Sequence, residues 1–303
     1  MGQHGAATEY EQFVSFTLEF RCNLRCNYCM IEDVMDHLVP ESRERFEELL
    51  EYNARTHAWR GVILTGAEIT LRSDLSELAG MARAAGFEHV RIQSHGMRLA
   101  QQAYCQKLVE AGVDQYFISM PAADETTHDA ITGVPGSRVK TLKGLRHLEA
   151  YAHVSVITNT VVTTQNYRSL PQIVAALSHF SQLKRMEFWH YWPMHETDSK
   201  GLIARHTEVL PYLLEAIELA QGYGRDVEIK NFPQCLLGKY KNLLVNQQPQ
   251  LYIDPAFWHE FERNGFYQCV YRGQCRSEEC LGLNSAYLAK YGDEAQALSP
   301  MTE

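Results

Sequence analysis

The sequence predicts an α/β fold built on a parallel sheet, followed by a small cysteine-rich extension at the C-terminus. Runs of apolar, β-branched and aromatic residues of strand length alternate with segments of helical periodicity. Seven of the eight cysteines fall into two groups, one after the first predicted strand and one in the last third of the chain. The alternating pattern ends near Glu228, where a cysteine-containing segment begins.

Six segments have the composition of β-strands, and they are residues 13–20, 61–65, 89–93, 115–119, 154–162 and 186–192. Helical periodicity fills the intervals, for example in residues 40–54, 73–86 and 168–180. Strand–helix units in series predict parallel strands with right-handed crossovers, in an α/β barrel or an open doubly wound sheet. Six units fit within about 190 residues, whereas an eight-unit barrel normally needs about 250.

Composition excludes several classes of protein. The 303 residues are 45% hydrophobic and 21% charged, which is not the composition of a disordered, collagenous or coiled-coil chain. A net charge of −9 makes nucleic acid an unfavourable partner. No apolar run reaches the roughly 18 residues of a membrane span, and no signal peptide is recognisable. We therefore expect a cytoplasmic protein without a membrane partner, whose cysteines are reduced or bound to metal.

The cysteines predict two metal centres. The first group, with the spacing C-x3-C-x2-C, is Cys22, Cys26 and Cys29, and the second is Cys235, Cys269, Cys275 and Cys280. The eighth, Cys105, lies on a predicted amphipathic helix and is interpreted as a buried apolar residue. Four thiolates complete the coordination of an iron–sulfur cluster or a structural zinc, whereas three leave one position open for chemistry.

Unusual polar segments follow directly on the predicted strands. They are residues 21–29, 65–68, 94–96, 120–129, 158–166 and 190–196. In a parallel barrel the loops after the strands gather on one face, where active sites are built. The first cysteine group, a Gly-containing turn with a carboxylate, and several His, Ser and aromatic residues are therefore expected around one mouth.

The sequence resembles the radical S-adenosylmethionine (SAM) superfamily. The first cysteine group, with Tyr28 before its last cysteine, matches that family's signature, and the turn TGAE resembles its Gly-Gly-Glu motif with Ala67 replacing a glycine. The segments SMPAADETTHDAITGVPGSRVKTLKGL and TNTVVTTQNYRSLPQI resemble its fourth and fifth units. The likeness covers residues 13–192, and the tail resembles the SPASM and Twitch types of auxiliary-cluster module.

The resemblance implies a partial (β/α)6 TIM-like barrel with a small C-terminal cysteine-rich cluster-binding extension. The expected divisions are an N-terminal tail (1–12), the radical SAM barrel (13–227) and an auxiliary-cluster module (228–303). It also implies that the first cysteine group holds a [4Fe–4S] cluster whose fourth iron binds SAM. A zinc ion held by these thiolates and His95 is the alternative.

The predicted contacts to SAM begin with Glu68, a good acceptor for the methionine ammonium. The other predicted contacts are Tyr28, Thr65, Gly66, Ala67, Ser94, Ser119, Asn159, Val161, Trp192 and Pro193. Groups expected near the substrate, as proton donors, proton acceptors or hydrogen-bonding groups, are Glu19, His95, His190 and Tyr191. The register near Trp189 stays open at this point, because a slip of one residue exchanges the inward and outward side chains.

The tail cysteines are expected to hold a second [4Fe–4S] cluster. This cluster would accept an electron from a substrate radical, relay electrons inward or organise the tail; a zinc ion is the alternative.

The resemblance then implies an oxidoreductase that cleaves SAM to a 5′-deoxyadenosyl radical and removes hydrogen from a C–H bond. Net oxidation would give a dehydrogenated or cross-linked product. A flavodoxin- or ferredoxin-type donor would supply electrons. The substrate would be a small metabolite, or a peptide delivered by a separate partner. The alternative hypothesis is that the protein is a non-enzymatic iron–sulfur or zinc scaffold.

Overall fold

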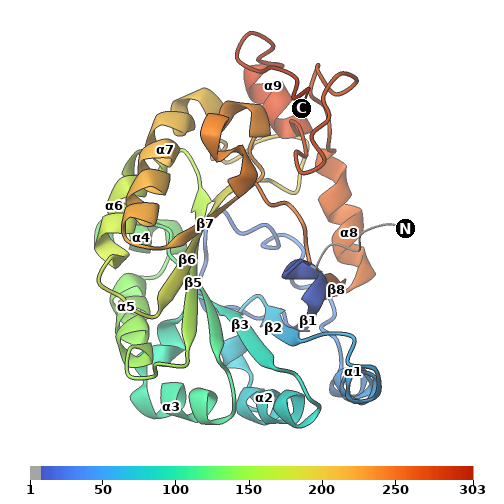
Figure 1. Ribbon diagram of the computed structural model, residues 1–303, viewed down its shortest axis with the longest axis vertical. Helices are drawn as coiled ribbons and strands as arrows, with labels where there is room; N and C mark the ends of the chain where they lie inside the picture. Colours follow the sequence, from blue (N-terminus) through green and yellow to red (C-terminus); the bar gives the residue numbers. More distant parts are fainter. Residues whose placement is uncertain (1–7, 303) are drawn as a thin grey trace.

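The computed structural model describes residues 8–302, so most of the predicted N-terminal tail lies outside the described residues. One parallel sheet has the order β7-β6-β5-β4-β3-β2-β1-β8 (Figure 1). Its strands are β1 Phe13–Glu19, β2 Gly61–Gly66, β3 His89–Ser94, β4 Gln115–Ser119, β5 Ser155–Val162, β6 Leu183–His190, β7 Asp226–Lys230 and β8 Gln250–Tyr252. This α/β architecture confirms the predicted fold class.

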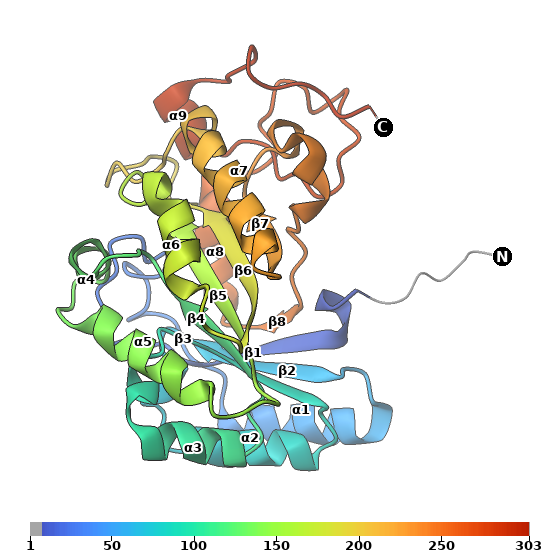
Figure 2. The ribbon, with the colours of Figure 1, turned by 60° about the vertical axis from the view of Figure 1, so that its left-hand side comes forward.

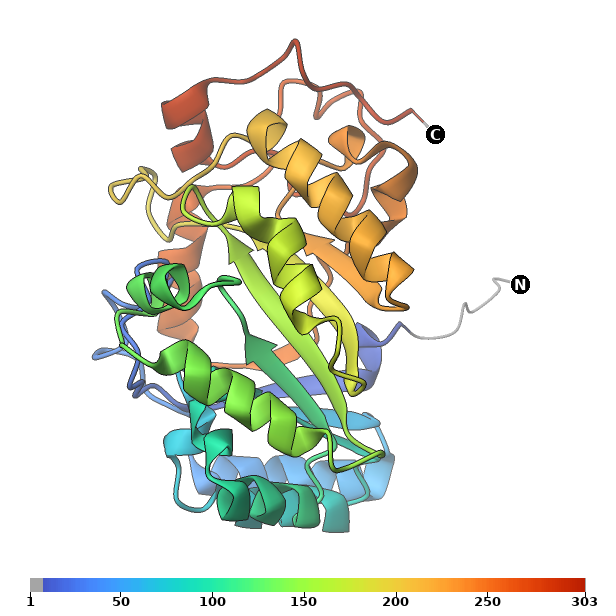
Figure 3. The same ribbon diagram turned by 90° about the vertical axis from the view of Figure 1, so that its left-hand side faces the viewer.

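Helices cover the outer face of the sheet, with α1, α2 and α3 below it in Figure 2 and α5, α6 and α7 in front of it in Figure 3. The helices are α1 Arg43–Thr56, α2 Leu75–Ala84, α3 Gln102–Glu110, α4 Glu125–Thr132, α5 Ser137–Leu148, α6 Leu170–Leu177, α7 His206–Gly222, α8 Pro255–Phe261 and α9 Ser285–Tyr291. None of the described helices is both long enough and apolar enough to cross a membrane.

Side chains alternate along each strand between the outer face of the sheet, which the helices cover, and the inner face, which lines the lumen of the partial barrel. On β1, Val14, Phe16 and Leu18 are buried in the main core with Phe46 of α1. The start of α1 is fixed by Ser42, whose side chain accepts a hydrogen bond from the Arg45 amide. The intervening β1 residues therefore face the lumen and reach the mouth at the carboxyl end of the strand.

The sheet contains two strands beyond the six predicted from the sequence. β7 pairs with β6 over residues 226–230, so the expected division between residues 227 and 228 falls inside this strand. β8 has three residues and pairs with β1 at the other edge. Charged residues alternate along β7 and β8 is very short, so neither carries the apolar run that identified the other strands.

The C-terminal part packs onto the loops at the carboxyl ends of the strands. In Figure 1 it lies at the opposite end of the molecule from α2 and α3. A second apolar cluster joins Tyr191 and Ile203 of the β6–α7 loop to Leu283, Tyr287 and Leu298. The mouth of the sheet and the cysteine-rich tail thus share one apolar contact region.

Candidate functional site

The first cysteine group lies on the loop between β1 and α1. Its three thiols are half-buried and free. Two backbone hydrogen bonds hold the loop to the end of α4, from the Arg25 amide to the Thr132 carbonyl (2.9 Å) and from the Asn27 amide to the Ile131 carbonyl (3.0 Å). Helix α4 lies in the segment that resembles the fourth unit of the radical SAM family, and these two bonds show that it positions the cysteine loop.

Burial dominates the environment of these thiols. Burial, with the charge of Glu68 adding, raises the pKa of Cys22 to about 11. Burial, with the charges of Cys29 and Cys22 adding, raises the pKa of Cys26 to about 12. The Leu24 amide donates to Cys22 Sγ at 3.4 Å, and the Tyr28 hydroxyl is hydrogen-bonded to Cys26. The thiols are therefore close enough to influence one another electrostatically, and each of these two has a hydrogen-bond donor of the kind that tunes cluster-bound sulfur.

The end of β2 lies against the end of β1. A Cβ atom on Gly66 would lie 1.9 Å from the Glu19 carbonyl oxygen, and the Ala67 amide donates to the same oxygen at 2.7 Å. Glycine is thus required at position 66 by close backbone approach. Ala67 does not have a positive φ, which agrees with the replacement of glycine there.

Glu68 is enclosed by protein donors. Its carboxylate is fully buried and accepts from the Thr70 amide (3.0 Å) and hydroxyl, the Ser94 hydroxyl (2.8 Å) and the His95 amide (2.9 Å). This arrangement differs from the expectation that the carboxylate faces the methionine ammonium. In this structure Glu68 joins the end of β2 to the end of β3.

His95 is buried at the end of β3, with both ring nitrogens engaged. Nδ1 accepts from the Met97 amide at 3.1 Å, and Nε2 lies 2.7 Å from Asn23 Oδ1 and 3.0 Å from Glu68 Oε2. Burial lowers the pKa of His95 although the charge of Glu68 opposes the shift. His95 is therefore occupied within the protein and does not present a free nitrogen to a substrate, contrary to its predicted role.

Several predicted contacts do meet at the carboxyl end of the sheet. Ser119 pairs with Asn159 in register across β4 and β5, and Asn159 Nδ2 is a buried donor without a partner among the described residues. Tyr28, Val161 and Tyr191 pack in one apolar cluster. The Thr65 hydroxyl donates to Gln93 Oε1 on β3 at 2.7 Å. Residues from four strands thus converge beside the cysteine loop.

Two further predicted groups, Glu19 and His190, are engaged within the protein. Arg21 forms an ion pair with the Glu19 carboxylate and donates to it from its side chain and its amide. His190 lies on the helix side of β6, where Nε2 donates to the Ala204 carbonyl at 2.8 Å and the ring lies 4.4 Å from that of His206. The expectation that His190 reaches the mouth is wrong, because His190 lies on the same side of β6 as the core residues Met186 and Phe188.

Trp192 and Pro193 face the C-terminal part. The Trp192 ring stacks on Phe266 with ring centroids 4.8 Å apart, and its buried Nε1 has no partner among the described residues. Asn264 donates to the Pro193 carbonyl at 2.7 Å. These contacts join the loop after β6 to the segment after α8.

The lumen contains a charged network that was not predicted from the sequence. Glu187 and Trp189 lie on the inner face of β6, and the Glu9 carboxylate bridges Arg91 of β3 and Arg185 of β6. Lys230 Nζ donates to the Val245 carbonyl at 2.7 Å, which joins the end of β7 to the segment that precedes β8. Arg185 and Glu187, which are two residues apart and lie among apolar residues of β6, were the available signal.

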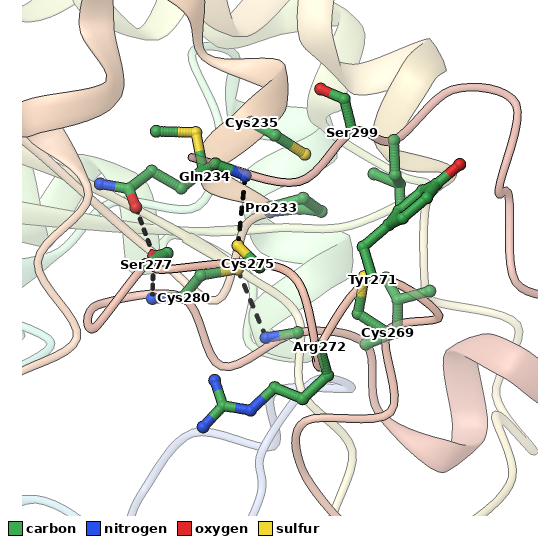
Figure 4. Close-up of a pocket in the computed structure, with 14 residues that line it drawn as sticks. Pro233, Gln234, Cys235, Cys269, Tyr271, Arg272, Cys275, Ser277, Cys280 and Ser299 are labelled. Carbon is green, nitrogen blue, oxygen red and sulfur yellow. Dashed lines mark hydrogen bonds between the residues drawn. The ribbon is translucent and has the colours of Figure 1, made fainter. Parts of the chain in front are cut away.

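The four tail cysteines line one small pocket, part of which is open to solvent (Figure 4). The Met301 amide donates to Cys275 Sγ and the Gly282 amide to Cys280 Sγ, both at 3.4 Å. Ser277 accepts from the Cys280 amide at 3.0 Å. Among residues 8–302, no three His, Cys, Asp or Glu side chains are grouped so as to hold a single metal ion.

Comparison with known proteins decides the family. A profile described as the Radical SAM superfamily matches residues 19–177, just over half of the chain, and these residues contain the first cysteine loop and the TGAE turn. The chain belongs to the radical SAM superfamily. Membership implies a [4Fe–4S] cluster and SAM, and the triad, the turn and the unpartnered Asn159 amide offer suitable ligand and hydrogen-bonding groups.

Curated relatives in the superfamily have different chemistries. The chain is 30% identical over 171 residues to a probable GTP 3′,8-cyclase of Methanopyrus kandleri, covering 56% of this chain and 54% of that protein. It is 28% identical over 182 residues to the Fe-coproporphyrin III synthase of Methanosarcina barkeri, covering 58% and 43%. The chain thus spans about half the length of the curated relatives that it matches.

Solved structures share the fold. The enzyme anSMEcpe with bound AdoMet and a peptide superimposes with a TM-score of 0.58 at 15% identity, covering 71% of this chain and 64% of that chain. Streptococcus suis SuiB bound to the precursor peptide SuiA gives a TM-score of 0.59 at 15% identity, covering 78% and 52%. At this identity the comparison establishes the shared architecture of the sheet.

Proposed function

We propose that this protein is a radical SAM oxidoreductase whose first cysteine group, Cys22, Cys26 and Cys29, holds the SAM-binding [4Fe–4S] cluster. The observation that carries the proposal is the meeting of this loop with the Gly66–Ala67 turn and the unpartnered Asn159 amide at the carboxyl end of a radical SAM sheet. When bound, the cluster and SAM supply the radical that removes hydrogen from a substrate C–H bond.

The protein's own residues orient the cofactor and exclude water. The turn after β2 offers backbone carbonyls to the SAM ammonium, and Asn159 Nδ2 offers a donor to SAM from β5. Tyr28, Val161 and Tyr191 form the apolar wall of the mouth. Burial, with the charges of Asp198 and Cys29 adding, raises the pKa of Tyr191 to about 12, so its phenol is protonated at neutral pH beside the cysteine loop.

The tail forms the second half of the proposal. The cysteines Cys235, Cys269, Cys275 and Cys280 would hold an auxiliary [4Fe–4S] cluster, which is supported by their shared cavity and by amide donors to sulfur. Hydrogen abstraction leaves a substrate radical, and loss of one more electron and one proton gives a dehydrogenated or cross-linked product. The auxiliary cluster would accept that electron, which makes the reaction a net oxidation.

The substrate class and the electron donor belong to the same proposal. A peptide or a small metabolite is supported by relatives named as a cyclase and a porphyrin synthase, and by peptide-bound structures of the same fold. A net charge of −9 argues against nucleic acid. A flavodoxin- or ferredoxin-type protein would supply the first electron.

The deciding experiment is iron and sulfide analysis with electron paramagnetic resonance after anaerobic reconstitution. Wild type should bind about eight irons, and alanine variants of either cysteine group about four. SAM should perturb the signal of wild type and of the tail variant, but not of the C22A/C26A/C29A variant. The matched control C105A, whose thiol is fully buried in the main core, should keep about eight irons.

Three results would contradict the proposal. Four irons in wild type and none in the triad variant would leave the tail to zinc or to structure and remove the electron acceptor. A protein that binds iron but forms no 5′-deoxyadenosine with SAM and dithionite would be a scaffold. Regeneration of SAM during turnover would exclude net oxidation by the proposed route.

A further inference from the structure

His95 lies between the two segments that form the proposed SAM site. On one side its ring contacts Glu68 at the end of β2, and on the other it contacts Asn23 in the cysteine loop. Because Nδ1 accepts from the Met97 amide, the ring proton is on Nε2. This single N–H donates to Asn23 Oδ1 at 2.7 Å, and the same Nε2 lies 3.0 Å from Glu68 Oε2.

We propose that His95 is a positioning residue that couples the order of the cysteine loop to the buried Glu68 carboxylate. The inference rests on the proposed function for the identity of the ligands at these two segments. Ligand binding at the turn after β2 and cluster retention at Cys22 would then depend on the same imidazole. His95 would act through its hydrogen bonds, without contact to substrate.

The contact is well placed to order the loop. Asn23 is an exposed residue adjacent to Cys22, and the bond to His95 is the one hydrogen bond of its side chain among residues 8–302. The imidazole is itself only 7% exposed, so water competes poorly for this bond. The other anchors of the loop, at Arg25 and Asn27, lie beyond Cys22 and do not fix this first turn.

Removal of the imidazole should leave the fold intact. Glu68 keeps the Ser94 hydroxyl, the Thr70 donors and the His95 amide when the ring is lost. The His95 carbonyl also keeps the Thr141 hydroxyl, at 2.8 Å. The effect of H95A is thus expected in the cysteine loop rather than in global stability.

The variants separate the hydrogen bond from the ring. Glutamine places a side-chain N–H near the position of histidine Nε2, so H95Q should retain the bond to Asn23, whereas H95A removes the donor and N23A removes the acceptor. If the two residues act through one bond, H95A/N23A should behave like either single variant. His147, half-buried on α5 and bonded to the Leu99 carbonyl, gives the matched control H147A.

The test is hydrogen exchange of the cluster-free full-length protein, followed by mass spectrometry of peptides spanning residues 22–29. H95A and N23A should exchange about fivefold to tenfold faster than wild type there, as expected for loss of one shielded hydrogen bond. H95Q and H147A should exchange at the wild-type rate. Unchanged exchange in H95A, or additive effects of H95A and N23A, would overturn the proposal.

A second measurement uses the reconstituted protein. Iron should leave the first cluster for a chelator faster in H95A than in wild type, and the SAM-induced change in the paramagnetic signal should need more SAM. H95Q should restore both properties, which a general packing role would not predict. If wild type takes up no iron at the triad, the proposed function fails, and the exchange experiment still decides the role of His95.

Discussion

The indole N–H of Trp189 donates to the Glu187 carboxylate at 2.8 Å on the inner face of β6. Phe188 between them is 1% exposed in the main core on the helix side. This contact fixes the phase of the strand, which places Tyr191 toward the mouth and His190 toward α7. It also places a carboxylate inside the lumen, beneath the proposed site.

Glu187 is expected to make stability fall as pH rises. Burial, with the charge of Glu228 adding, raises its pKa from 4.5 to about 7. The folded state therefore binds a proton that the unfolded state has lost between these values, and stability declines from pH 4.5 to pH 7. At pH 8, E187Q should be more stable than wild type by about 2–3 kcal/mol, whereas near pH 4.5 the two should match.

Urea unfolding of both proteins between pH 4.5 and pH 8 measures this difference. The exposed Glu215 on α7 provides the control E215Q, which should follow the wild-type curve. A constant difference between E187Q and wild type across the range would show that Glu187 is ionised throughout.

Glu9 should have the opposite pH dependence. Burial alone would raise its pKa, but hydrogen bonds and charges from Arg185 and Arg91 outweigh burial and lower the pKa below 4.5. Its contribution is then complete above pH 4.5 and disappears as pH falls through the lowered value. E9Q should cost about 1–3 kcal/mol at pH 7, since the carboxylate is one-third exposed, and the loss should vanish in acid.

Thermal and urea unfolding at pH 7 and in acid would test the role of Glu9. E11Q is the control, because the hydrogen bonds of Glu11 within residues 8–302 join it to Thr8 of its own short segment. An equal loss in E9Q and E11Q would mean that the bridge across Arg91 and Arg185 does not stabilise the lumen.

Local sequence patterns predicted the six principal strands and both cysteine groups, because each depends on residues close together in the chain. The lumen network was not predictable in this way. Glu9 meets Arg91 and Arg185 from 82 and 176 residues away, and no local pattern carries that pairing. β8 escaped prediction because three residues are too few to show a period of two.

The site residues show the same division. The predicted convergence of Ser119 and Asn159 depends on strand register and agrees with the structure. The predicted acid–base roles of Glu19 and His95 assumed that polar side chains at the mouth are free. Each is instead bound by a neighbour, Arg21 for Glu19 and Asn23 for His95. The partner of His95 lies 72 residues away in the chain, so that pairing appears only in three dimensions.

Gly66 should be intolerant of substitution. A Cβ atom there would overlap the Glu19 carbonyl oxygen at 1.9 Å, so G66A must separate the ends of β1 and β2. We expect a loss of about 2–4 kcal/mol in unfolding free energy, typical of severe steric conflict in a packed site. Iron uptake at the first cysteine group should fall as well, because the cysteine loop starts immediately after Glu19.

The control for Gly66 is G222A at the end of α7. A Cβ atom at Gly222 would have no neighbour within 4 Å, so this variant should be neutral or slightly stabilising. Denaturant unfolding and iron analysis of the two variants measure both effects. Normal iron uptake in G66A would mean that the two strand ends adjust without disturbing the loop.

The end of the chain should be required for the tail site alone. Met301 brackets Cys275, since its amide donates to Cys275 Sγ at 3.4 Å and its carbonyl accepts from the Arg276 amide at 2.7 Å. Leu298 is 6% exposed in the apolar cluster that the tail shares with Tyr191. Truncation after residue 297 removes these contacts and leaves all four tail cysteines in the chain.

The truncated protein should bind about four irons instead of about eight, and it should keep the SAM-perturbed signal of the first cluster. M301A preserves both backbone contacts and should bind as much iron as wild type. Loss of iron from both sites would mean that the tail also supports the mouth through the apolar cluster. Retention of all eight irons would mean that the four cysteines hold the auxiliary cluster without the closing segment, and that amide donation from Met301 is dispensable.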